Sequence, residues 1–226
     1  LFGGLELAVE VARPTMPVCM EVPKIEMLKA EREIVGLYLS AHPLDDYKYI
    51  LDDMCSANLG DFKDIANSQP RDVSFGGMVV DSVHLTSKQG RPYGRFKMED
   101  YSGETHEFSL FGHDYENLRK YMYRDYLLYV KGKIQPRRFQ SKENVATGRT
   151  EMELKITSIV QMHEVEEQIK EMFITLPLSY LTDSFATDVI ERVKTSKGKT
   201  TLRIKIADQE NNIAVQMYSK KYKVSV

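Results

Sequence analysis

Polar residues occupy every second position of one short segment that is otherwise apolar or small. The polar positions are Lys131, Lys133, Gln135 and Arg137. Because successive side chains of a β-strand point to opposite faces, all four are expected on one face of a strand. Three positive charges along one face can bind a row of phosphate groups, so the segment predicts a site for a polyanion.

Basic residues gather in two stretches that contain no acidic residue, although the whole chain has a net charge of -2. Residues 1–70 hold twice as many acidic as basic residues, whereas residues 71–162 hold an excess of basic ones. The two stretches contain Lys88, Arg91, Arg95 and Lys97, and then Lys131, Lys133, Arg137, Arg138 and Lys142. Clustering of this kind is the electrostatic footprint of a nucleic-acid backbone. Clustering of like charges costs electrostatic free energy when no partner neutralises it.

Three aromatic residues near these stretches are candidates for stacking on bases: Tyr93, Phe111 and Phe139. Stacking contributes about 1–3 kcal/mol per base. The alternative is that the charges are solvated surface and the aromatic side chains belong to a core. For Phe96 and Phe108 we favour the core, because they alternate in step with the other expected inward residues. For the basic stretches we favour nucleic acid.

The elements that position these residues are short strands within residues 71–162. Val73, Phe75 and Val79 alternate along a first strand, in which Gly76-Gly77 would permit a bend or bulge. The expected set also contains a loop at 87–94, a second strand with Phe96 and Met98 inward, a Ser102-Gly103 turn, strands at 105–111, 126–136 and 151–162, and a helix at 113–124. Five such strands with one helix predict a small oligonucleotide-binding (OB) barrel.

The expected fold class is mixed: a helical linker, a five-stranded OB-fold β-barrel, and then a small α+β domain. The expected segments are a flexible connector at 1–23, the helical linker at 24–70, the OB-fold nucleic-acid-binding domain at 71–162 and the α+β domain at 163–226. The last domain ends in what looks like a strand, so a truncated unit is one expectation.

Helix ends within the flanking segments are predicted from capping residues and breakers. A helix from Lys24 should run until Pro43 ends it, and Asp45 should cap a second helix. In the last domain, Asp183 should cap a helix that Gly198 ends, between a strand at 172–176 and a pair of strands joined at 211–212.

No arrangement of residues predicts catalysis or metal binding in this chain. His42 has no nearby nucleophile, and the pairs Asp45-Asp46 and Asp52-Asp53 fit capping and surface roles. Cys19 and Cys55 are too far apart in the sequence for a zinc motif, which favours a reduced, cytoplasmic protein without a cofactor. The chain contains no apolar run long enough to cross a membrane, so no membrane partner is expected.

One string, Gly-Leu-Tyr-Leu-Ser-Ala-His-Pro-Leu at 36–44, followed by the barrel segment 86–112, resembles the C-terminal region of the bacterial DNA polymerase III alpha subunit. The resemblance implies that the full-length protein is a DNA-directed DNA polymerase, a nucleotidyltransferase, and that this chain lacks its catalytic residues. It implies that the barrel binds single-stranded template DNA. It also implies that the last domain docks the tau subunit of the clamp loader. Leu1-Phe2 resembles the end of a motif that binds the sliding clamp.

Two alternatives remain open at this stage. The barrel could be the anticodon-binding domain of a class II aminoacyl-tRNA synthetase, which uses a similar pattern. It could also be an interaction scaffold that binds protein and not nucleic acid.

Overall fold

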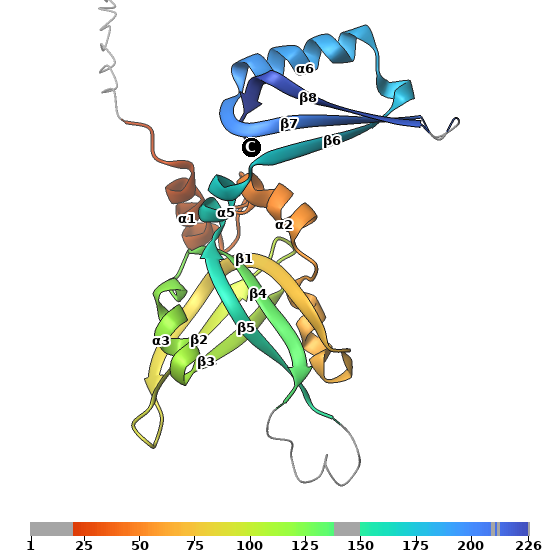
Figure 1. Ribbon diagram of the computed structural model, residues 1–226. Coiled ribbons are helices and arrows are strands. Elements are labelled where there is room, and N and C mark those ends of the chain that lie inside the picture. The colour runs from red at the N-terminus through yellow and green to blue at the C-terminus, as the bar shows by residue number, and fades with distance from the viewer. Residues whose placement is uncertain (1–19, 138–149, 209–210, 212, 226) are drawn as a thin grey trace, which may run out of the picture. The chain divides into compact units, whose positions relative to one another are not determined.

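Figure 1 shows a computed structural model of the chain, which describes residues 20–137, 150–208, 211 and 213–225. The chain divides into two compact units, Leu1–Pro43 and Leu44–Val226, and each is described by itself. The division into four segments expected from the sequence stays a prediction.

In the first unit, helix α1 (Lys24–Val35) ends at a glycine. Gly36 has a φ of 89°, and its amide donates to the carbonyl oxygen of Arg32 at 2.9 Å. Glycine enters this left-handed region without steric cost and is the usual helix terminator. The expected continuation of the helix to Pro43 is therefore wrong.

The segment after α1 is folded back by one carboxylate. Glu31 accepts hydrogen bonds from the backbone amides of Leu39 and Ser40, each at 3.0 Å, and from the hydroxyl of Ser40. The Ser40 hydroxyl, followed by the amides of Ser40 and Leu39, lowers the pKa of Glu31. Arg32 also donates to the hydroxyl of Tyr38 at 3.1 Å. Residues 38–40 thus fold back against the preceding helix.

Short helices precede the barrel in the second unit: η1 (Asp45–Tyr47), α2 (Lys48–Met54) and η2 (Leu59–Asn67). The expected cap by Asp45 is wrong, because neither η1 nor α2 has a side-chain capping bond. The Asp45 carboxylate accepts instead from the hydroxyl of Tyr101, at 2.8 Å. Asp45 therefore accepts a hydrogen bond from a residue distant in the sequence and does not cap the helix that follows it.

Helix η2 directly precedes the first strand of the barrel. It begins with a reciprocal capping box in which the amide of Asn58 donates to Asp61 at 3.0 Å. Phe62 projects from it into the core, with 2% of the side chain exposed.

Five antiparallel strands form the OB barrel, and its elements are coloured from yellow to turquoise in Figure 1. The strands are β1 (Arg71–Thr86), β2 (Pro92–Glu99), β3 (Thr105–Phe111), β4 (Leu127–Pro136) and β5 (Met152–Gln161). Between β3 and β4 lie α3 (Gly112–Leu118) and η3 (Arg119–Tyr121). The strand order is β3-β2-β1-β4-β5, and η2 contacts both edge strands, β3 and β5. This is the partly open five-stranded Greek-key arrangement expected from the sequence.

Strand β1 is long enough to serve two neighbours. Its first half pairs with β4 and its second half with β2. A Cβ on Gly77 would lie 2.6 Å from the carbonyl oxygen of Glu99, so this close approach requires glycine. The bulge expected at Gly76-Gly77 lies instead between Val79 and Asp81, where the register with β2 shifts.

Aromatic rings fill the barrel interior. Phe62 meets Phe75 edge to face at 4.7 Å between ring centroids, and Phe75 stacks on Phe108 at 5.3 Å. Phe96 is 1% exposed and Phe108 is 5% exposed, so the predicted core role of both is confirmed. His106, on the inner side of β3, lies 4.7 Å from the ring of Phe108 and takes part in the same cluster.

The C-terminal elements are α5 (Met162–Gln168), β6 (Glu171–Pro177), η4 (Leu178–Tyr180), α6 (Asp183–Thr195), β7 (Lys197–Asp208) and β8 (Ile213–Val224). The sheet order is β6-β7-β8, with β6 and β7 parallel and β7 and β8 antiparallel. The expected strand-helix-strand-strand unit is confirmed.

Two expected boundaries of α6 are wrong. Thr182 and not Asp183 caps the helix, and its hydroxyl accepts from the amide of Phe185 at 3.2 Å. The helix ends at Thr195, and Gly198 lies within β7.

Candidate nucleic-acid interface

The outer face of β1, β2 and β3 carries three rows of side chains that run across the strands. One row is Leu85, Tyr93 and Phe111, the next is Val83, Arg95 and Ser109, and the third is Asp81, Lys97 and Glu107. We call these nine residues the platform. The nine side chains share the outer face because successive side chains of a strand point to opposite faces. The intervening residues, such as Phe96 and Phe108, are buried in the core.

Two rings make an aromatic surface at one end of the platform. Tyr93 and Phe111 are cross-strand partners whose centroids are 5.4 Å apart with an interplanar angle of 18°. Phe111 is 62% exposed although it is a large apolar side chain. Tyr93 is half-buried, so the pair offers the exposed ring of Phe111 and part of the Tyr93 ring to unpaired bases.

A basic turn follows the end of β1 next to this aromatic pair. The amide of Gly90, at φ 77°, donates to the carbonyl oxygen of Ser87, and the amide of Ser87 donates to that of Arg91, each at 2.9 Å. The turn is therefore held by its own backbone, and Lys88 and Arg91 are exposed on it. Flexible cations beside an aromatic surface suit phosphate contacts.

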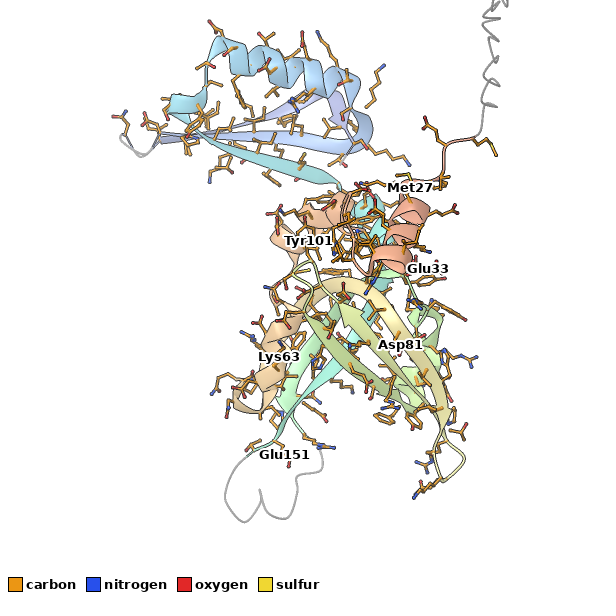
Figure 2. The ribbon with its side chains drawn as sticks, turned by 180° about the vertical axis from the view of Figure 1, so that it is seen from behind. Met27, Glu33, Lys63, Asp81, Tyr101 and Glu151 are labelled. Atoms are coloured by element: carbon orange, nitrogen blue, oxygen red, sulfur yellow. The ribbon has the colours of Figure 1, made fainter. Side chains whose placement is uncertain are left out.

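The platform is less positive in space than its sequence suggests. Arg95 lies 3.4 Å from the carboxylate of Glu107, and Lys97 is the direct cross-strand neighbour of Glu107. Asp81 adds a second carboxylate beside Lys97 and is labelled on the barrel in Figure 2. The two acids come from the neighbouring strands, so they do not interrupt the basic stretch in the sequence.

The basic residues of β4 lie on a different part of the sheet, since β1 separates β4 from β2. Lys131 and Lys133 are exposed, Gln135 is half-buried, and Gly132 and Ile134 are buried, so the predicted polar face is confirmed within β4. Arg137 is exposed directly after the end of the strand.

Acidic and aromatic neighbours accompany these β4 residues. Lys133 lies 3.8 Å from Asp72, and Arg137 lies 3.2 Å from Glu151, which Figure 2 labels. The ammonium group of Lys131 lies 5.8 Å from the ring centroid of Tyr129. The β4 residues are thus not one continuous positive surface with the platform.

The remaining predicted residues fall outside the described part of the chain. These are Arg138, Phe139 and Lys142, together with Leu1 and Phe2 of the proposed clamp motif.

Sequence reasoning missed two apolar members of the platform. Val83 is 40% exposed and Leu85 is half-buried, and both face outward although apolar residues of β1 before the bulge face the core. Their alternation is visible in the sequence, but the shift between Val79 and Asp81 decides the face.

Several titratable groups of the second unit have shifted pKa values, and His106 and Cys55 are two of them. Burial lowers the pKa of His106, with an opposing effect from Glu107. Burial, followed by the charge of Asp52, raises the pKa of the Cys55 thiol to about 12. Within the described residues, no three His, Cys, Asp or Glu side chains lie close enough to hold a metal ion. No helix of the described part is long and apolar enough to span a membrane.

Residues 172–226 match the family model described as DNA polymerase III alpha subunit, C-terminal domain. The chain is 29% identical over 134 residues to the DNA polymerase III subunit alpha of Vibrio cholerae, a match that covers 59% of this chain and 11% of that protein. It is 32% identical over 104 residues to the same subunit of Treponema pallidum, covering 46% and 8%. With that of Pseudomonas fluorescens it shares 24% identity over 174 residues, covering 76% and 14%.

The chain therefore spans between 8% and 14% of the length of these curated relatives. The resemblance to the C-terminal region of the DNA polymerase III alpha subunit is confirmed.

Two solved structures resemble part of the chain. One is the mitochondrial single-stranded DNA-binding protein Rim1 of S. cerevisiae, with a TM-score of 0.29 and 16% identity, covering 41% of this chain and 96% of that one. The other is a small single-stranded DNA-binding protein from Streptomyces coelicolor, with a TM-score of 0.26 and 18% identity, covering 42% and 95%. The OB assignment rests on the strand order given above.

Proposed function

We propose that this chain, related in sequence to the C-terminal region of the DNA polymerase III alpha subunit, binds single-stranded template DNA on the platform. The observation that carries the proposal is the stacked pair of half-buried Tyr93 and exposed Phe111 beside the basic turn. Bases stack on the rings, while Lys88 and Arg91 contact phosphates. A duplex keeps its bases paired and cannot use the rings, so the site favours single strands.

The residues of β4 extend this proposal. Lys131, Lys133 and Arg137 form a second, partly neutralised basic surface that can contact the same strand beyond the platform. Arg138, Phe139 and Lys142 belong to this part of the proposal by sequence alone.

For the full-length protein we propose a DNA-directed DNA polymerase acting in the cytoplasm. In it, this chain binds template and the catalytic residues lie elsewhere. We also propose contacts with the sliding clamp through Leu1-Phe2 and with the tau subunit of the clamp loader through the last unit. The sequence relationship supports these assignments.

Fluorescence anisotropy with a labelled single-stranded oligonucleotide tests the platform. Replacing both rings, Tyr93→Leu with Phe111→Leu, should weaken binding at least about tenfold, because each stacked base contributes about 1–3 kcal/mol. Tyr123→Leu is the matched control, since Tyr123 is 54% exposed and lies outside the platform. Lys88→Ala with Arg91→Ala should make the dependence of log K on log salt shallower by about 1.4, the contribution of two phosphates of a single strand. Absence of binding at low salt, or equal binding by all variants, would instead favour the protein-scaffold alternative.

A further inference from the structure

The three-stranded sheet formed by β6, β7 and β8 has two faces of different character. On one face, Leu202 is 3% exposed and Ile206 is 8% exposed, and Figure 1 shows α6 lying along one side of this sheet. On the other face, Phe173 and Tyr218 are each 57% exposed. Two large aromatic side chains therefore project from the face that α6 does not cover.

The two rings belong to a single row that crosses all three strands. Arg203 on β7 is the register partner of Phe173 on β6 and also of Tyr218 on β8. Strands lie about 4.8 Å apart, so the two rings flank the arginine at roughly 10 Å from each other. This spacing is wide enough for each of the two exposed rings to contact a different base.

The arginine in this row is oriented by a carboxylate and by an aromatic ring. Its guanidinium lies 5.8 Å from the ring centroid of Phe173, and its Nη2 donates to Glu171 at 2.5 Å. A planar cation held beside aromatic rings can both stack on a base and donate to a phosphate.

The charges of this face favour a polyanion. The row next to the aromatic one contains Lys205 at its centre, and Lys223 is the partner of Thr201 in the row on the other side. Glu171 is the one acid in these three rows, and it is already paired with Arg203. Exposed aromatic side chains on a sheet, interleaved with cations, are the usual surface for single-stranded nucleic acid.

We propose that this face of the C-terminal sheet is a second binding surface for single-stranded DNA. Phe173 and Tyr218 stack on unpaired bases, while Arg203, Lys205 and Lys223 contact phosphates. The surface is separate from the platform in sequence and in strand composition, so its existence does not depend on the function proposed for the platform. The chain would then bind a single strand at two places.

The test removes the two surfaces in turn from the full chain. In a background with Tyr93→Leu and Phe111→Leu, residual binding to oligo-dT at low salt should remain and should fall about tenfold when Phe173→Leu and Tyr218→Leu are added. Tyr180→Leu is the matched control, because Tyr180 is 67% exposed and lies in η4, outside the sheet. Circular dichroism melting curves of each variant establish that the fold is retained.

Arg203→Lys separates stacking from charge. It should weaken binding severalfold with an unchanged salt slope, whereas Arg203→Ala should also make the slope shallower by about 0.7. Photocrosslinking with iodouracil-substituted DNA should label peptides that contain Phe173 or Tyr218.

Crosslinks confined to the platform, or DNA binding that is the same with and without Phe173 and Tyr218, would overturn the proposal and point to a protein partner for this face. Loss of binding only on changing Tyr93 and Phe111 would leave the platform function intact. The failure of either proposal is therefore distinguishable from the failure of the other.

Discussion

Removing one carboxylate from the platform should strengthen DNA binding. Glu107 lies 3.4 Å from Arg95, and the two side chains are 56% and 47% exposed. The Coulomb attraction at this distance is about 1 kcal/mol in bulk water, and exposed pairs of this kind contribute about 0.2–1 kcal/mol. Glu107→Gln should therefore cost the fold little, while releasing Arg95 for a phosphate and removing a repulsive charge.

The expected gain in affinity is about two- to fivefold at low salt, which corresponds to roughly 0.5–1 kcal/mol. One additional phosphate contact should steepen the dependence of log K on log salt by about 0.7. The assay is fluorescence anisotropy of a labelled single strand at about 50 mM and about 200 mM salt, because the screening of charges differs between these two concentrations.

The matched control is Glu151→Gln, which releases Arg137 on the β4 surface in the same way, from 3.2 Å. If the platform is the principal site, this change should have a smaller effect than Glu107→Gln. Equal or weaker binding by Glu107→Gln at low salt, with an unchanged slope, would refute the assignment of the platform. A larger gain from Glu151→Gln would move the principal site to β4.

Three further outcomes follow from contacts within the second unit. Burial depresses the pKa of His106, so this side chain binds a proton more readily in the unfolded chain than in the folded protein. The contribution of His106 to the free energy of unfolding should therefore be complete above about pH 6.5 and should decrease as the pH falls below it. His106→Leu should abolish that part of the pH dependence in urea denaturation, and an unchanged profile would count against it. Gly77→Ala should destabilise the barrel by about 1–3 kcal/mol, more than Gly76→Ala, because its Cβ would lie 2.6 Å from the backbone oxygen of Glu99. The closest neighbours of a Cβ on Gly76 are flexible side-chain ends, and the backbone oxygen of Leu128 lies at an ordinary 3.5 Å. The reverse order in urea midpoints would contradict this. The pKa of the Cys55 thiol is raised to about 12, so this thiol should be alkylated much more slowly in the native protein than after unfolding. Mass spectrometry of the peptide that contains Cys55 measures the two rates. Equal rates would show that the thiol is accessible in the native protein.

The local sequence located most elements but not their ends. The strands of the barrel follow from alternation, as with Phe96 and Met98, which are both buried. Pro43 is a strong helix breaker, but α1 ends before it is reached. Gly36 adopts the left-handed conformation that ends the helix. Asp45 is a good capping residue in isolation, and only the fold supplied Tyr101 as a competing partner.

Local sequence decides which side chains share a face of one element, because the period of a strand or helix is a local property. Tyr93, Arg95 and Lys97 had to face together, and so did Lys131 and Lys133. The tertiary structure alone decided that Tyr93 stands beside Phe111 and that acids from other strands approach the basic ones. It also decided that β1 separates the two basic stretches. Strand order and register are set by pairings between distant segments and by one bulge, and no local pattern encodes them.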